Sequence, residues 1–94
     1  MPRLAQLETP VSIDYPRTGE NVNSMHYAIR IDANDAAKVE ISIDDSSWQP
    51  CRKAVGYWWF DWSGYLPGKH LIHVQTYDTG AKVSALASRK VIVR

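Results

Sequence analysis

The 94-residue sequence has a single cysteine, Cys51, so no disulfide can close within the chain. Lys and Arg number 11 against 10 Asp and Glu, which gives a formal net charge of +1. This balance disfavours nucleic-acid binding, which needs a concentrated basic face. No run approaches the ~20 apolar residues of a membrane span, and the first ten residues lack the apolar core of a signal peptide. We expect a soluble protein without a membrane span. It is cytoplasmic if Met1 is the native start, and extracytoplasmic if the chain is excised from a longer one.

A helical period of 3.6 residues is also lacking. Alternation with a period of two dominates from residue 11 onward, and Tyr27, Ile29 and Ile31 illustrate it because all three fall on one side of an extended chain. Such alternation, rich in β-branched and aromatic residues, is typical of half-buried strands. The pattern predicts seven strands, at residues 11–15, 25–33, 38–44, 47–53, 56–62, 69–77 and 87–93.

Strands recurring at this spacing predict an all-β antiparallel sandwich. One sheet is expected to contain 25–33 and 56–62, and the opposing sheet 38–44, 69–77 and 87–93. Residues 10–94 form the single domain of this prediction, and residues 1–9 a flexible N-terminal segment. The side chains expected in the core are Tyr27, Ile29, Ile31, Val39, Ile41, Ile43, Phe60, Ile72, Val74, Val91 and Val93.

Three segments carry a resemblance to a known family. Residues 38–50, KVEISIDDSSWQP, resemble a "VEVSIDGG.WQP" hairpin of bacterial Ig-like domains. Residues 66–78, LPGKHLIHVQTYD, are similar to their "L.PG.H.I.V.A.D" segment, and 15–22 to their opening "P..G..V". A weaker similarity connects the chain to the Ig-like dimerisation domain of sulfite-oxidase-type enzymes. The resemblance implies an immunoglobulin-like sandwich that serves as a spacer, dimerisation or binding module, with no catalytic residue and no cofactor.

Candidate catalytic and metal-binding residues are few. Cys51 precedes two cations that could lower its pKa, but no nucleophile signature surrounds it. His70 and His73 lie three apart on one expected strand and therefore point to opposite faces, so His26 would have to join one of them across strands to bind a metal. Asp44–Asp45 suits a hairpin turn. We expect neither an enzyme nor a metal site.

Aromatic residues concentrate in one segment. Residues 48–65 contain seven of the ten aromatic side chains, and a strand with two faces cannot direct all of them into one core. If Trp58, Phe60 and Trp62 point inward, Tyr57 and Trp59 project outward. A register shifted by one residue would expose the first set instead. In either register at least one large aromatic side chain is exposed.

Exposed aromatic side chains often mark binding surfaces. The candidate site is an aromatic patch of Tyr57, Trp59, Arg30, Asp61 and Tyr65, unless Arg30 only covers a ring in a cation–π contact. A protein-interaction or self-association module is the first hypothesis, with a protein partner or a homodimer. The alternative is a carbohydrate-binding or carbohydrate-enzyme accessory domain. Sugar binding predicts coplanar rings beside free carboxylates and amides, whereas an interface predicts a flat aromatic patch ringed by Arg30 and other polar groups.

A second candidate surface lies on the outward side of residues 69–77. Alternation places Leu71, His73 and Tyr77 there, together with Gln75. We interpret this set as a solvated sheet face or as a second partner surface.

Overall fold

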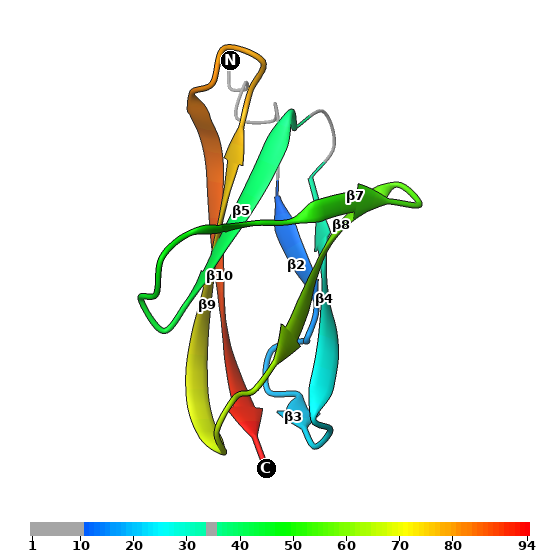
Figure 1. Cartoon of the computed structure of the whole chain (residues 1–94), viewed down its shortest axis with the longest axis vertical. Helices are drawn as coiled ribbons and strands as arrows, with labels where there is room; N and C mark the ends of the chain where they lie inside the picture. Colours follow the sequence, from blue (N-terminus) through cyan, green and yellow to red (C-terminus); the bar gives the residue numbers. More distant parts are fainter. Residues whose placement is uncertain (1–10, 34–35) are drawn as a thin grey trace, which may run out of the picture.

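The computed structural model describes residues 11–33 and 36–94 as two packed β-sheets (Figure 1). The predicted flexible segment 1–9 lies outside the described residues. Within them, no helix is long and apolar enough to cross a membrane. The strands of the described chain are β2 (Ser12–Tyr15), β3 (Asn21–Val22), β4 (His26–Asp32), β5 (Lys38–Ile43), β6 (Gln49–Pro50), β7 (Arg52–Ala54), β8 (Tyr57–Ser63), β9 (Gly68–Tyr77) and β10 (Val83–Val93).

The sheets have the strand orders β2-β4-β8-β7 and β3-β10-β9-β5-β6. Neighbouring strands pair antiparallel except for β3, which runs parallel to β10. This arrangement confirms an immunoglobulin-like β-sandwich. It also confirms the predicted division of the strands between the two sheets.

The core lies between the sheets and follows the predicted alternation. Eight of the predicted core residues are buried: Ile29, Ile31, Val39, Ile41, Ile72, Val74, Val91 and Val93. Tyr27, Ile43 and Phe60 are half-buried and pack against them. Trp58 and Trp62 also face inward, with 8% and 6% of their surface exposed. The register left open by the sequence is therefore the one that directs Tyr57 and Trp59 outward.

The prediction of one continuous strand at residues 47–53 is wrong. β6 pairs with β5 in one sheet, whereas β7 pairs with β8 in the other. The chain changes sheets at Cys51, whose N–H donates to the carbonyl of Val39 at 2.9 Å. Alternation cannot detect such a change because both halves remain extended.

The last strand also differs from its prediction, since β10 begins at Val83 rather than at residue 87. Its pairing with β9 shifts between Val83 and Ala85, and this irregularity interrupts the period of two. The two-residue strand β3 was not predicted. A strand this short carries too few residues to show a period.

The tight turn that follows β5 depends on left-handed backbone. Asp44 and Asp45 have φ values of 56° and 62°, and the Ser46 N–H donates to the carbonyl of Ile43 at 3.1 Å. These are the features of the type I′ turn that favours two-residue hairpins, and Asp tolerates this region. The turn fixes the end of β5, which forms one side of a cleft described below.

Candidate functional site

The outer face of the β2-β4-β8-β7 sheet gathers most of the predicted aromatic patch. The strand register places Tyr15, Arg30, Trp59 and Arg52 in one row across the four strands. Tyr57 lies two residues from Trp59 on β8 and therefore on the same face. The row depends on a β-bulge in β2, where the pairing with β4 shifts between Ile13 and Tyr15.

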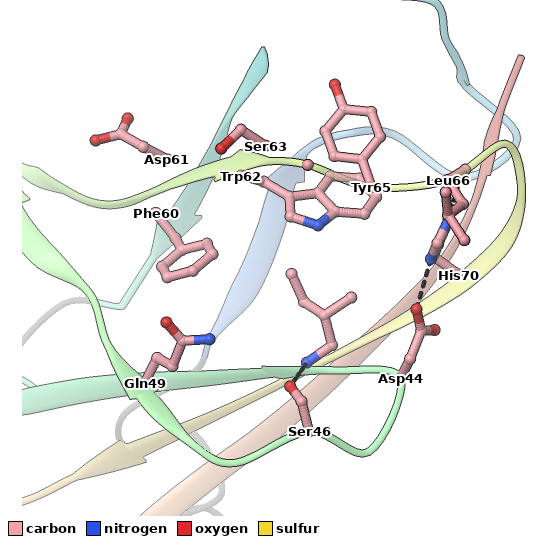
Figure 2. A pocket seen from close by; sticks show the side chains of 12 residues that line it. Asp44, Ser46, Gln49, Phe60, Asp61, Trp62, Ser63, Tyr65, Leu66 and His70 are labelled. Carbon is pink, nitrogen blue, oxygen red and sulfur yellow. Dashed lines mark hydrogen bonds and ion pairs between the residues drawn. The ribbon is translucent and has the colours of Figure 1, made fainter. Parts of the chain in front are cut away.

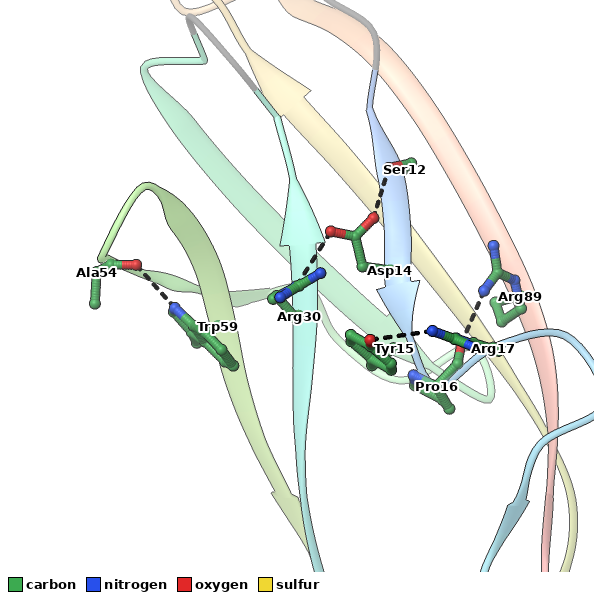
Figure 3. A network of polar contacts seen from close by, with 9 residues as sticks. All are labelled: Ser12, Asp14, Tyr15, Pro16, Arg17, Arg30, Ala54, Trp59 and Arg89. Carbon is green, nitrogen blue, oxygen red and sulfur yellow. Dashed lines mark hydrogen bonds and ion pairs between the residues drawn. The ribbon is translucent and has the colours of Figure 1, made fainter.

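Arg30 is the centre of this face. Its guanidinium carbon lies 4.7 Å from the ring centre of Tyr15 and 4.2 Å from that of Tyr57. Its Nε donates to Asp14 Oδ2 at 3.2 Å, and both side chains of this pair are about three-quarters buried. Figure 3 shows Asp14 directed toward Arg30 from the neighbouring strand. The cation is thus held on two sides by aromatic rings and by one carboxylate.

Trp59 is fixed by a hydrogen bond at its edge. Its Nε1–H donates to the carbonyl of Ala54 at 2.9 Å, across the β7–β8 hairpin (Figure 3). The rings of Tyr57 and Trp59 are 6.3 Å apart and meet edge to face at 78°. These two rings are therefore not coplanar and do not form one continuous stacking platform.

Asp61 occupies the lower part of the same face. Its carboxylate accepts from Arg52 Nη2 at 3.2 Å, yet 71% of the side chain is exposed. The register partner of Asp61 on β4 is Ala28, a small exposed residue. Ala28 therefore exposes a small side chain on this face, two residues from Arg30 on β4 and opposite Asp61 on β8.

A second set of contacts anchors the β2 end of the face. Arg17 donates to the hydroxyl of Tyr15 at 3.2 Å, and its guanidinium carbon lies 5.2 Å from that ring. Arg89, from the opposing sheet, donates to the carbonyl of Pro16 at 2.8 Å (Figure 3). The segment after β2 is thereby tied to both sheets.

Tyr65 is not part of this face. Its ring lies 4.1 Å from that of Trp62, and its hydroxyl donates to the carbonyl of Ser24 at 2.5 Å. It lines a cleft of about 480 Å³ between β8 and the end of β5. The sequence predicted one patch, and the structure separates Tyr65 from the other four members.

The cleft has an aromatic and a polar wall. Figure 2 shows Phe60 and Trp62 directed toward the side that carries Gln49 and Ser46, while Asp61 and Ser63 point away. The sequence analysis did not predict this cleft. The alternation of residues 56–62 indicated the aromatic wall. The change of sheet at Cys51, which leaves the cleft open, could not be detected in the sequence.

An ion pair closes one end of the cleft. His70 Nδ1 lies 2.5 Å from Asp44 Oδ2, and His70 Nε2 lies 2.6 Å from the carbonyl of Leu66. Both partners accept, so both ring nitrogens of His70 donate and the imidazolium form is favoured. Burial opposes this charge, but the hydrogen bonds to Leu66 and Asp44 outweigh it and raise the pKa of His70.

The pKa of Asp44 moves in the complementary direction. Burial alone would raise it, but the hydrogen bond from His70 and the 2.9 Å hydrogen bond from the Leu71 N–H lower it. The pair was missed because the sequence assigned Asp44 only to a turn. The alternation that places His73 on the outward face and His70 on the opposite one was the one available signal, and the structure packs the His70 ring edge-on against Trp62 at 5.3 Å.

The second predicted surface lies on the outer face of the β3-β10-β9-β5-β6 sheet. Tyr77 and Gln75 both donate to Glu40 Oε1, at 2.8 and 3.0 Å, and Lys38 lies 4.8 Å from the Tyr77 ring centre. The hydrogen bond from Tyr77 contributes most to lowering the pKa of Glu40. This end of the face is a polar network.

Leu71 and His73 continue along the same strand away from that network. Leu71 lies beside Ile92 and Lys90 in a hollow of about 390 Å³. His73 stands opposite Ser42 and Ser88 on the flanking strands. The three predicted members therefore share one face but contact different groups.

The remaining nucleophile and ligand candidates do not form a reactive centre. Burial, with a smaller contribution from Glu40, raises the pKa of Cys51 to about 12, so its thiol stays protonated at neutral pH. Its two neighbouring cations do not offset burial. Among the residues that the structure describes, no group of three or more His, Cys, Asp and Glu could hold a metal ion.

Neither a protein-family model nor a curated protein sequence matches the chain. Solved structures do match its fold. The fibronectin(III)-like modules of Clostridium thermocellum CbhA align with a TM-score of 0.71 at 20% identity, over 90% of this chain and 96% of theirs. The fold is thus of the fibronectin III-like kind within the Ig-like sandwiches.

Two endo-β-1,4-mannanases also contain a similar domain. Those of Thermotoga petrophila and Cellulomonas fimi align with TM-scores of 0.75 and 0.72, at 19% and 16% identity, over 93% of this chain. The chain spans only about a fifth of each mannanase, 20% and 19% of their lengths. At these identities the likeness concerns the fold.

Proposed function

We propose that the chain is a non-catalytic module that binds another protein, or a second copy of itself, through the outer face of the β2-β4-β8-β7 sheet. The observation that carries the proposal is Arg30, which is held between Tyr15 and Tyr57 beside Trp59. Arg, Tyr and Trp are the residues that dominate binding energy at protein interfaces. Fixed side chains also lose little conformational entropy on binding.

The orientation of the rings favours a protein partner over a sugar on this face. A saccharide that stacks on two rings needs them roughly coplanar, whereas Tyr57 and Trp59 meet at 78°. The neighbouring carboxylates, Asp14 and Asp61, are already paired with Arg30 and Arg52. A face of mixed aromatic and charged side chains is the arrangement expected for an interface.

A carbohydrate-related role is the second candidate, and the structural neighbours favour it. One neighbour is a module of CbhA, and two are parts of mannanases. Under this alternative the chain is an accessory module of a polysaccharide-degrading enzyme. It would then contact a polysaccharide or the enzyme's other domains.

Two measurements distinguish these roles. Sedimentation equilibrium over a wide concentration range tests self-association, and Trp59→Ala should shift any dimer toward monomer. Native electrophoresis through gels containing mannan or cellulose derivatives tests sugar binding. Retardation of the wild type that is lost in Trp59→Ala would contradict the protein-binding proposal and favour the carbohydrate role.

A further inference from the structure

The lower half of β8 has a strand partner on one side only among the described residues. β7 pairs only with Tyr57, Trp58 and Trp59, because it begins at Arg52 opposite Trp59, whereas β4 pairs with β8 as far as Ser63. Figure 1 shows β7 beside the upper part of β8 only. Residues 60–63 therefore present an open edge, whose unpaired N–H and C=O groups are a template for another strand.

The open edge adjoins the cleft that Tyr65 lines. Phe60 and Trp62 face inward from β8, while Ile43 and Gln49 form the opposite side. A strand added beside residues 60–63 would direct alternate side chains inward, because strand side chains alternate between the two faces. Those side chains would enter the cleft of about 480 Å³. One extended segment could therefore pair with the edge through its backbone and fill the cleft with its side chains.

The electrostatics of the cleft favour uncharged side chains. Asp44 is paired with His70 at 2.5 Å, and Asp61 with Arg52 at 3.2 Å. No carboxylate that lines the cleft is left without a cation to neutralise it. Aromatic surface from Phe60 and Trp62 offers contact to an apolar group.

We propose that this edge accepts an extended peptide of a partner protein by β-strand addition. The peptide pairs with residues 60–63 of β8 and inserts uncharged side chains at alternate positions into the cleft, between its aromatic and polar walls. Main-chain hydrogen bonds supply affinity in this mode and the pocket supplies specificity. This surface is additional to the outer sheet face and does not depend on the function proposed for that face.

A synthetic peptide with the sequence of residues 26–32, capped at both ends, is a suitable probe. This sequence already pairs with the other edge of β8, and it presents Tyr27, Ile29 and Ile31 on one side. Titrated into the ¹⁵N-labelled protein, it should shift the amide resonances of residues 60–63 and slow their hydrogen exchange. The amides of β4 should keep their protection, which distinguishes strand addition from exchange of β4.

Two controls make the test specific. A peptide N-methylated at alternate residues should bind about tenfold more weakly, since it loses two or more main-chain hydrogen bonds. Gln49→Trp places a bulky side chain in the cleft from an exposed position without altering the core, and should weaken binding to a similar extent. Lys82→Trp, an equivalent change at an exposed turn position, should leave binding unchanged.

Three results would overturn the proposal. The first is no protection of residues 60–63 at millimolar peptide, and the second is equal binding of the methylated and unmethylated peptides. The third is the same set of shifts from mannohexaose but not from the peptide, which would assign the cleft to a small saccharide.

Discussion

At the residue scale, the environment of Arg30 explains why aromatic side chains remain on an outer sheet face. Each cation–π contact at a partly exposed site contributes about 0.5–1 kcal/mol, and Arg30 makes two of them, to Tyr15 and Tyr57. The guanidinium of Arg30 lies over both rings, and these contacts stabilise the face without a partner. Tyr15, Tyr57 and Trp59 remain half-buried, so part of each residue is still accessible to a partner.

The two adjacent tryptophans of β8 should respond oppositely to truncation. Trp58→Ala removes a buried side chain and should lower the free energy of unfolding by roughly 3–5 kcal/mol. Trp59→Ala loses a half-buried ring and one hydrogen bond to Ala54, so about 1 kcal/mol is expected. Urea denaturation followed by circular dichroism measures both. A greater loss for Trp59→Ala than for Trp58→Ala would contradict the observed register.

The His70–Asp44 pair should make stability depend on pH. The pKa of His70 is raised above the ordinary value of 6.5, so its stabilising contribution is complete below that pH and is lost as pH rises through the folded pKa. The pKa of Asp44 is lowered below 3.8, so its contribution is present above that pH and is lost as pH falls through the folded pKa.

Thermal unfolding measured between about pH 6 and pH 9 tests the contribution of His70 to stability. The wild-type midpoint should fall across this range, and the fall should be smaller in His70→Gln. His73→Gln, on the opposite face of β9, is the matched control and should retain the wild-type profile. Identical profiles for the wild type and His70→Gln would show that the pair does not control the pH dependence.

At the scale of elements, the β7–β8 hairpin has an unfavourable turn residue. Val55 has a φ of 54° and is 89% exposed, and Gly56 follows it with a φ of 81°. A β-branched residue is strained at positive φ, whereas Asn-Gly is the preferred pair in such two-residue turns.

Val55→Asn should therefore stabilise the protein, by about 1 kcal/mol. Thermal denaturation by calorimetry measures the gain. Val55→Ile keeps the branched side chain and should show no gain. A loss of stability in Val55→Asn would mean that Val55 makes a contact that offsets its backbone strain.

The alternation of β5 can be tested at its most central residue. Ile41 is fully buried and lies opposite Val74 of β9. Ile41→Ala should lower the free energy of unfolding by about 2–5 kcal/mol, while Ser42→Ala should cost less because it removes a hydroxyl and no apolar volume. Chemical denaturation compares the two, and a loss below about 1 kcal/mol for Ile41→Ala would contradict the assigned inward face.

Strands with strict alternation could be predicted from the sequence, and those that change environment could not. β4, β5 and β9 were predicted to within a residue or two because each keeps one face in the core along its whole length. The segment at 47–53 was not, since the chain leaves one sheet at Pro50 and enters the other at Arg52. A period of two records which side is buried but not the sheet to which it belongs.

At the scale of the whole molecule, the sandwich has an aromatic outer face and a cleft. Most residues of the outer face were predicted from the sequence, but the cleft was not. Arg30, Tyr57, Trp59 and Asp61 were predicted together, and the two sheet partners β4 and β8 bring them onto one face. Tyr15 and Asp14 join them through a β-bulge that the sequence does not reveal. The cleft depends on the change of sheet at Cys51, which makes β7 begin at Arg52 opposite Trp59, and this is a property of the three-dimensional path alone.

Under the proposed function, the outer face of the β2-β4-β8-β7 sheet binds a protein. Site-specific photo-crosslinking probes this face, with p-benzoylphenylalanine in place of Ala28, the small exposed residue opposite Asp61. We expect a discrete crosslinked protein, either a second copy or one partner, that is lost when Arg30→Ala is added and is absent when the probe replaces Lys82. No crosslinked product from position 28 in the native cell extract, or one unaffected by Arg30→Ala, would contradict the account.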